Sequence, residues 1–196
     1  MQYLKESSIK IPLPSSRQQT DYTCGPTALR SIAKYYGKDL GNEKQFAELC
    51  DAGKNKGSHP EKIAEAARKL GFDAKVKQNM TLKELFSYMK RKMPVIVAIQ
   101  AWSNSDNKKE AMKGYKELKD GHYVVVIGYD KENIYFEDPS IKATRPYLAK
   151  KEFLKRWIDK EAYIKNPVVK RLGIIIREKA PKKIKPEHIN KTQRLP

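Results

Sequence analysis

The chain of 196 residues carries 41 Lys and Arg against 23 Asp and Glu, a formal net charge of +18 at pH 7. Its length suits a single domain with its own hydrophobic core. It holds no apolar run of about 18 residues that could span a membrane, and its first residues lack the apolar segment of a secretory signal peptide. We therefore expect no transmembrane segment and a cytoplasmic location.

The positive charge is concentrated near the C-terminus. Residues 165–196 hold ten Lys and Arg against two Glu, a net charge of +8. From Ala180 onward Pro and Lys dominate, which predicts a disordered tail. Such a tail can attract acidic peptides, nucleic acid or an anionic membrane, but charge alone names no partner. We divide the chain into a lead-in over residues 1–10, one domain over residues 11–178 and a basic tail over residues 179–196.

Cysteine and histidine are scarce in this sequence. Cys24 and Cys50 are too few for a disulfide framework, so both are expected to be free thiols. The histidines are His59, His122 and His188, and neither a C-x-x-C nor an H-x-x-x-H spacing is present. We therefore expect no metal site and no cofactor.

The predicted helices come first along the chain. Apolar residues recur at three- and four-residue steps between glycine and proline stop signals. His59 precedes Pro60 at a helix entry, and Thr81 with Glu84 forms a capping box. The predicted helices cover residues 24–37, 42–53, 59–71 and 81–92.

The predicted strands follow. A β-branched run over residues 94–102 indicates a buried strand, and residues 122–130 and 133–139 form a hairpin that turns at Lys131 and Glu132. The charged stretch over residues 104–121 is interpreted as a partly helical connection. A late helix and a last strand are predicted over residues 149–159 and 171–178. Helices first and an antiparallel sheet later define an α+β fold.

A cysteine stands at the N-terminus of the first predicted helix, in the stretch QQTDYTCGPTAL. Pro26 would start that helix just after Cys24, so the thiol would meet the partial positive charge of a helix N-terminus. That charge favours the thiolate, which is the nucleophilic form. The alternative is that Cys24 is a small buried hydrophobic residue, which is the commoner role of an intracellular cysteine.

A nucleophilic cysteine needs a base, and His122 is the best placed of the histidines. His188 lies in the predicted tail, and His59 is better explained as a helix-entry residue. His122 opens an apolar strand, where a polar ring must find a partner. The alternative is a structural histidine whose hydrogen bonds are satisfied.

A base needs an orienting group, and Asp138 lies at the same end of the predicted hairpin as His122. The offset is uneven, because His122 stands nine residues before Lys131 and Asp138 seven after it. Pairing therefore requires a bulge or a strand stagger. Asp130 lies at the turn and is a poorer candidate. Since Asp138 precedes Pro139, a role as a turn residue is the alternative.

The oxyanion that forms in acyl transfer needs hydrogen-bond donors. The backbone N–H of Cys24 can supply one, and the side-chain amide of Gln18 or Gln19 can supply another. Either glutamine could equally be a solvated polar side chain. The set of Gln, Cys, His and Asp in this order is far more specific than any one member.

Two blocks of the sequence, QQTDYTCGPTALRSIAKYYG and GHYVVVIGYDKENIYFEDPS, resemble the C39 peptidases, and particularly the stand-alone C39-like proteins. The resemblance extends from about Ile11 to Asp159. It implies a papain-like cysteine peptidase fold, in which N-terminal helices pack on an antiparallel sheet.

The same resemblance implies roles for single residues. Cys24 corresponds to the nucleophile, His122 to the base and Asp138 to the group that orients the base. Gln18 takes the oxyanion role, because the family's glutamine stands six residues before its cysteine. Gln19 is the alternative if the register slips.

The family's best-known members are amino-terminal domains of bacterial ABC exporters, which cut leader peptides after a double glycine. The resemblance therefore implies a cysteine peptidase that acts on a peptide or protein. No P-loop GxxxxGK[ST] is present, so export and ATP hydrolysis are not implied, and leader cleavage is an analogy. Two alternatives are a papain-like acyltransferase with the same cysteine and a non-catalytic basic module that binds peptides or nucleic acid.

Overall fold

The structure, a computed structural model, describes residues 9–38, 40–54, 57–101, 118–141, 144–160, 168–178 and 192–194. Within these ranges most helices come early in the chain and most strands come late. The helices in these ranges are α1 (Cys24–Tyr35), α2 (Glu43–Leu49), α3 (Pro60–Lys69), α4 (Leu82–Lys90) and α6 (Lys150–Arg156). The strands are β1 (Ile9–Lys10), β2 (Asp73–Lys77), β3 (Val95–Gln100), β4 (Gly121–Tyr129), β5 (Asn133–Glu137), β6 (Arg145–Ala149), β7 (Ile158–Lys160), β8 (Val168–Lys170), β9 (Gly173–Arg177) and β10 (Thr192–Arg194).

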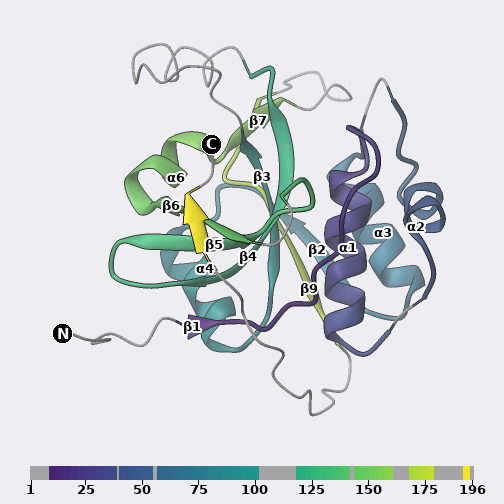
Figure 1. Cartoon of the computed structure of the whole chain (residues 1–196), viewed down its shortest axis with the longest axis horizontal. Coiled ribbons are helices and arrows are strands. Elements are labelled where there is room, and N and C mark those ends of the chain that lie inside the picture. The colour runs from purple at the N-terminus through teal and green to yellow at the C-terminus, as the bar shows by residue number, and fades with distance from the viewer. Residues whose placement is uncertain are drawn as a thin grey trace.

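One large sheet organises these elements (Figure 1). Its strand order is β10-β6-β5-β4-β3-β9-β2, with β1 beside β4, and β7 pairs with β8 in a separate ribbon. Every pair in the large sheet is antiparallel except β10 with β6. Helices α1, α2 and α3 gather at the right of the view, and α6 lies at the left beside β6. The predicted α+β class, with N-terminal helices on an antiparallel sheet, is confirmed.

Helix starts follow local sequence signals. The Thr81 side chain accepts from the Glu84 N–H while Glu84 bonds back, which confirms the predicted capping box of α4. His59 is the N-cap of α3 and its ring nitrogen accepts from the Glu61 N–H, as expected of a helix-entry residue. Helix α2 has a further capping box, from Asn42 with Gln45.

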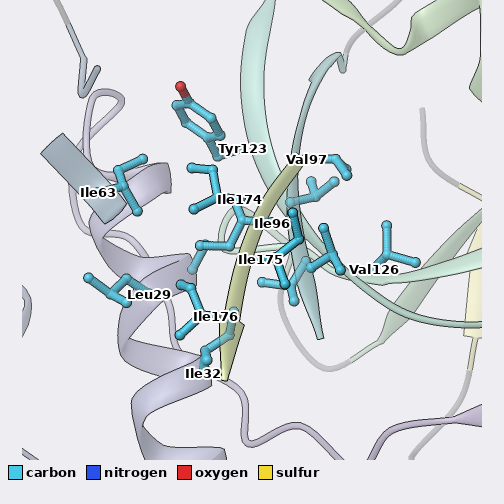
Figure 2. Close-up of a cluster of buried hydrophobic side chains, with 14 of the residues drawn as sticks. Leu29, Ile32, Ile63, Ile96, Val97, Tyr123, Val126, Ile174, Ile175 and Ile176 are labelled. Carbon is cyan, nitrogen blue, oxygen red and sulfur yellow. The ribbon is translucent and has the colours of Figure 1, made fainter. Parts of the chain in front are cut away.

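Apolar side chains from α1 and α3 meet the sheet in one buried cluster (Figure 2). Burial of each such Leu, Ile or Val side chain contributes about 1.5–3 kcal/mol, so this cluster fixes the two helices against β9, β3 and β4. The labelled members are Leu29, Ile32, Ile63, Ile96, Val97, Tyr123, Val126, Ile174, Ile175 and Ile176.

The hairpin of β4 and β5 carries a bulge. Tyr129 pairs with Ile134, and the register then shifts between Val126 and Gly128, so that Val126 pairs with Phe136. One extra residue on β4 is accommodated there. The bulge takes up one residue of the uneven offset in the sequence and brings the end of β5 toward the start of β4.

Some segments differ from the prediction. The helix expected over residues 42–53 ends at Leu49, because Asp51 adopts a left-handed conformation (φ 50°) that cannot continue a helix. Most of the predicted charged connection falls on residues 102–117, outside the described ranges.

The tail predicted to be disordered includes one short strand. Residues 192–194 form β10 and pair with Arg145–Tyr147 of β6, so disorder does not hold for these three residues, whose backbone groups find partners at the sheet edge. Residues 179–191 lie outside the described ranges.

Candidate active site

Cys24 is the first residue of α1, with Thr23 as the N-cap. The predicted helix of residues 24–37 and α1 therefore begin at the same residue, two positions before Pro26. The Cys24 side chain is nearly buried, at 8% exposure. Its thiol therefore lies in the positive field of a helix N-terminus with little solvent to screen it.

The glycine after Cys24 lets α1 approach the rest of the domain. A Cβ at Gly25 would stand 2.6 Å from Ile63 Cδ1 of α3 and 3.2 Å from Tyr123 Cδ2 of β4. A side chain at position 25 would require the end of the Ile63 side chain to move and the Tyr123 ring to give slightly. Gly25 thus permits the start of α1 to pack against the strand that carries His122.

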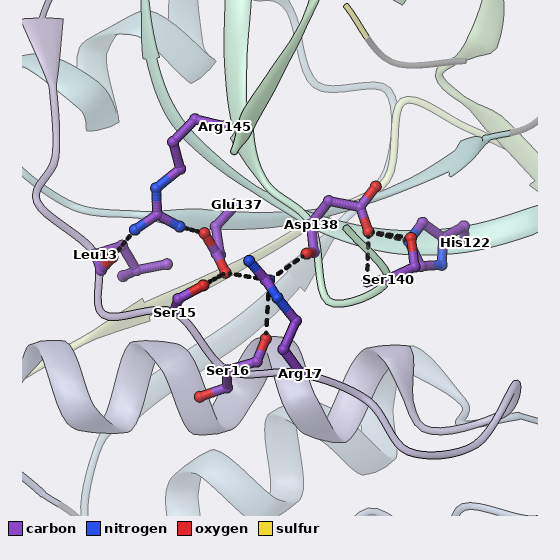
Figure 3. A network of polar contacts seen from close by, with 9 residues as sticks. All are labelled: Leu13, Ser15, Ser16, Arg17, His122, Glu137, Asp138, Ser140 and Arg145. Atoms are coloured by element: carbon purple, nitrogen blue, oxygen red, sulfur yellow. Dashed lines mark hydrogen bonds and ion pairs between the residues drawn. The ribbon is translucent and has the colours of Figure 1, made fainter. Parts of the chain in front are cut away.

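His122 lies near the start of β4 and is buried. Its Nε2 is 2.8 Å from Oδ1 of Asp138, which follows the last residue of β5 (Figure 3). The same Oδ1 accepts from the backbone N–H of Ser140 at 2.8 Å and from its hydroxyl at 2.7 Å. These bonds fix the Asp138 carboxylate, and the carboxylate in turn fixes the imidazole ring.

The electrostatics of His122 come from both of its neighbours. Burial lowers the pKa of the imidazolium, but Asp138 and a hydrogen bond with the Cys24 side chain outweigh burial and raise the pKa to about 10. Burial raises the pKa of Asp138, and the adjacent His122 and Ser140 outweigh that effect and lower it. Because Asp138 occupies Nε2, Nδ1 is the ring nitrogen left for Cys24.

Gln18 lies on the loop that leads to α1. Its side-chain Nε2 donates to the Thr20 carbonyl at 2.8 Å, and the Thr23 hydroxyl donates to that same carbonyl at 3.1 Å. The shared acceptor brings the Gln18 amide close to the residue before Cys24. Gln18 Oε1 is buried without a hydrogen-bond partner. The neighbouring Gln19 has an exposed side chain, so the structure brings Gln18 rather than Gln19 to this position.

A buried polar cluster holds residues 15–17 to the end of β5 (Figure 3). Glu137 is fully buried and accepts from Arg17 at 3.0 Å and from Ser15 at 2.7 Å, and Arg145 forms a further ion pair with it. Arg17 also donates to the Asp138 carbonyl at 2.8 Å. The segment before Gln18 is therefore fastened to the segment that presents Asp138.

A second link crosses the same interface. The backbone N–H of Gln18 donates to the Pro139 carbonyl at 3.0 Å. Sequence reasoning did not single out Arg17, Glu137 or Ser140. Ser140 could have been recognised from the Asp-Pro-Ser turn, in which the aspartate side chain bonds to the backbone two residues on. The pairing of Arg17 with Glu137 has no local sequence signal, because the two residues are 120 positions apart.

A further buried carboxylate, that of Asp159, lies against the first residue of β4. The Asp159 side chain lies so close to Gly121 that a Cβ there would stand 2.5 Å from Oδ1. Gln100 Nε2 donates to Asp159 Oδ1 at 3.0 Å. Burial raises the pKa of Asp159 to about 6, partly opposed by hydrogen bonds from Lys160 and Gln100. The glycine before His122 thus makes room for this side chain.

The remaining candidates lie elsewhere. Asp130 accepts from Tyr135 and from the turn N–H groups of Glu132 and Asn133, so it is a turn residue. Cys50 is fully buried as the C-cap of α2, and burial raises its pKa to about 12. His188 falls outside the described ranges.

In the described ranges, no three His, Cys, Asp or Glu side chains gather as metal ligands would. No helix there has the length and apolar character needed to cross a bilayer.

The fold is that of a C39 peptidase domain. The chain matches the model of the Peptidase_C39 like family over residues 10–163, and it belongs to that family. A comparison with curated protein sequences gives no significant match.

Solved structures of the same fold are similar over most of their length. The peptidase domain of Streptococcus ComA, described as a bifunctional ABC transporter involved in quorum sensing, is 25% identical, with a TM-score of 0.59 over 84% of this chain and 97% of that domain. A C39-like peptidase from Bacillus anthracis, described as putative, is 16% identical, with a TM-score of 0.67 over 90% and 100%. A double glycine motif protease from an AMS/PCAT transporter, solved with its leader peptide, is 18% identical, with a TM-score of 0.56 over 86% and 94%.

Proposed function

We propose that this protein is a cysteine peptidase that hydrolyses a peptide bond through Cys24, His122 and Asp138. One observation carries the proposal: the buried His122 ring bonds to Asp138 on one side and to the Cys24 side chain, at a helix N-terminus, on the other. This is the relation of nucleophile, base and orienting group that acyl transfer requires. We also propose residues 11–178 as the single catalytic domain.

The first half of the reaction forms a thioester. His122 takes the Cys24 proton, and the raised pKa of His122 favours the imidazolium and thiolate as an ion pair. The thiolate attacks the peptide carbonyl carbon, and the carbonyl electrons move to oxygen. When the oxyanion collapses, the C–N bond breaks and His122 returns the proton to the leaving amine.

The second half releases the acid. Water loses a proton to His122 and attacks the thioester carbonyl, and collapse of the new oxyanion breaks the C–S bond. His122 then returns its proton to the Cys24 thiolate that the broken C–S bond releases, which restores the starting state. Asp138 holds the ring in one tautomer throughout and stabilises its charged form.

The oxyanion is bound by the backbone N–H of Cys24 and the side-chain amide of Gln18. Gln18 Nε2 carries two hydrogens, and the bond to Thr20 uses only one of them. The second hydrogen remains for the substrate oxygen. A preformed donor of this kind is worth about 10²–10³ in kcat.

The substrate we propose is a peptide with a double glycine before the cleaved bond. The support is the family, together with relatives described as ComA and as a double glycine motif protease with its leader peptide. The bare Gly-Gly sequence also requires no side-chain pocket on the acyl side of the bond.

The test is cleavage of an acetylated peptide that ends in Gly-Gly joined to 7-amino-4-methylcoumarin. We expect release of coumarin by the wild type and by Cys50→Ala, and none by Cys24→Ala. Full turnover by Cys24→Ala would refute the proposal. Adding an amine acceptor separates hydrolysis from acyl transfer: a free acid as the main product supports a peptidase, and an amide product would assign the protein to the acyltransferases.

A further inference from the structure

A loop of residues 19–23 joins the two proposed oxyanion donors. Gln18 stands directly before it, and Cys24 directly after it. The relative position of the Gln18 amide and the Cys24 N–H therefore depends on the shape of this loop. The Thr20 carbonyl in this loop accepts two hydrogen bonds, one from the Gln18 amide and one from the Thr23 hydroxyl, and these bonds hold the loop in a compact turn.

Both ends of the loop are bonded to one carboxylate, that of Glu43. The backbone N–H of Gln19 donates to Glu43 Oε1 at 2.8 Å and to Oε2 at 3.0 Å. The Thr23 hydroxyl donates to Glu43 Oε1. Glu43 is 5% exposed, so these bonds form with little competition from water.

Helix α2, which carries Glu43, does not need this side chain for its own cap. Asn42 and Gln45 already form a reciprocal capping box, which satisfies the N–H groups of these two residues. The Glu43 carboxylate instead accepts hydrogen bonds from the loop before α1. This is possible because α2 packs beside α1 (Figure 1). A buried carboxylate needs hydrogen-bond partners that replace its lost hydration. Here the partners are Gln19 and Thr23, which adjoin the two proposed oxyanion donors.

We propose that Glu43 is a positioning residue that sets the geometry of the oxyanion hole. Its carboxylate accepts hydrogen bonds from Gln19, which follows Gln18, and from Thr23, which precedes Cys24. It acts by holding these two residues in place. This inference rests on the proposed function, because it assigns a role within the same site. A carboxylate suits the task, since it offers only acceptors to an N–H and a hydroxyl that converge on it.

The experiment compares Glu43→Gln with Glu48→Gln, a matched change at an exposed position on the same helix. The neutral amide keeps the size of Glu43 but places an NH₂ against two donors, so the loop loses at least one bond. With the Gly-Gly coumarin peptide, we expect kcat of Glu43→Gln to fall roughly 10–100-fold and KM to change less than about twofold. Glu48→Gln should match the wild type in both constants.

A merely structural role is separated by two further readouts. Alkylation of Cys24 by iodoacetamide needs the thiolate but forms no oxyanion, so Glu43→Gln should not slow it. In the double variant with Gln18→Ala, kcat should fall by less than the product of the two single effects, because both changes damage one oxyanion hole. If Glu43→Gln loses its fold, Glu43→Asp keeps the charge, shortens the reach and takes its place in the same scheme.

The outcomes distinguish this inference from the proposed function. If Gln18→Ala lowers kcat while Glu43→Gln behaves like Glu48→Gln, the positioning role is wrong and the peptidase stands. The positioning role is also overturned by multiplicative effects in the double variant, by slower alkylation of Cys24, or by a rise in KM alone. If Gln18→Ala leaves kcat unchanged, the oxyanion role of Gln18 itself fails.

Discussion

Cys24 and Cys50 are both buried at the end of a helix, but the two ends differ. Cys24 begins α1, where the helix dipole is positive, and hydrogen-bonds with His122. Cys50 caps the C-terminus of α2, where the dipole is negative, and burial raises its pKa to about 12. The comparison teaches that burial raises the pKa of a thiol where nothing opposes it, and that two buried cysteines at opposite kinds of helix end lie in opposite local fields.

The largest expected effect is a difference in thiol reactivity. With iodoacetamide at pH 7.5, Cys24 of the folded protein should react roughly 10³-fold faster than Cys50, because the thiolate of Cys50 is suppressed by its high pKa. Peptide mass spectrometry locates and counts the adducts. In guanidinium chloride the two rates should converge, and a difference that persists there would contradict an origin in the fold.

The next effect concerns the group that orients the base. Asp138→Asn removes the charge that raises the pKa of His122. We expect kcat on the Gly-Gly coumarin peptide to fall about 10²-fold and the alkylation advantage of Cys24 over Cys50 to shrink. Asp130→Asn, a change of the same kind at the turn of the hairpin, is the control. Equal rates for the two variants would show that Asp138 has no special role.

A smaller effect is the pH dependence of stability. The pKa of His122 rises from 6.5 to about 10 on folding, so the folded state binds this proton more tightly than the unfolded chain. The resulting stabilisation is fully present below pH 6.5 and is lost as the pH rises through 10. The wild type should be more stable than His122→Asn by a margin that is on the order of 4 kcal/mol larger at pH 6 than at pH 10. Urea titrations at several pH values measure it, and a gap that does not depend on pH would contradict the assignment.

The smallest effect is expected at the inert cysteine. Cys50→Ala removes a fully buried side chain that packs in the core, which should lower the free energy of unfolding by about 1 kcal/mol. Cleavage of the coumarin peptide should keep the wild-type kcat and KM. Chemical denaturation measures the first quantity, and a large loss of kcat in a folded variant would give Cys50 an unforeseen part in the reaction.

Local signals predicted the parts of the fold that depend on few residues. The capping box of Thr81 and Glu84 and the helix entry at His59 are fixed by bonds within three residues, so the sequence reveals them. The hairpin was predicted from two strand-like runs. Its uneven offset indicated either a bulge or a strand stagger, and the structure has a bulge between Val126 and Gly128. The relation of His122 to Asp138 followed from that hairpin.

Features that depend on tertiary packing were not predicted. Glu43 is an ordinary glutamate in the sequence, and its role emerges only when α2 packs against the loop before α1. Strand β6 was missed because Pro146 lacks an N–H and normally argues against a strand. The short strand β10 follows a basic stretch whose composition indicated disorder, and only its pairing with β6 reveals it.

The polar cluster around Glu137 has a consequence for how the protein is made. Arg17 and Glu137 stand 120 positions apart, and Cys24 leaves the ribosome long before His122 and Asp138 have been translated. At about 5–20 residues per second, roughly 5–25 s of synthesis separate the thiol from its partners. During that time the nascent chain presents a cysteine without a base. The proposed peptidase therefore becomes active only when almost the whole domain has emerged from the ribosome. By then the domain can fold, and it is no longer exposed to cleavage as an unfolded chain.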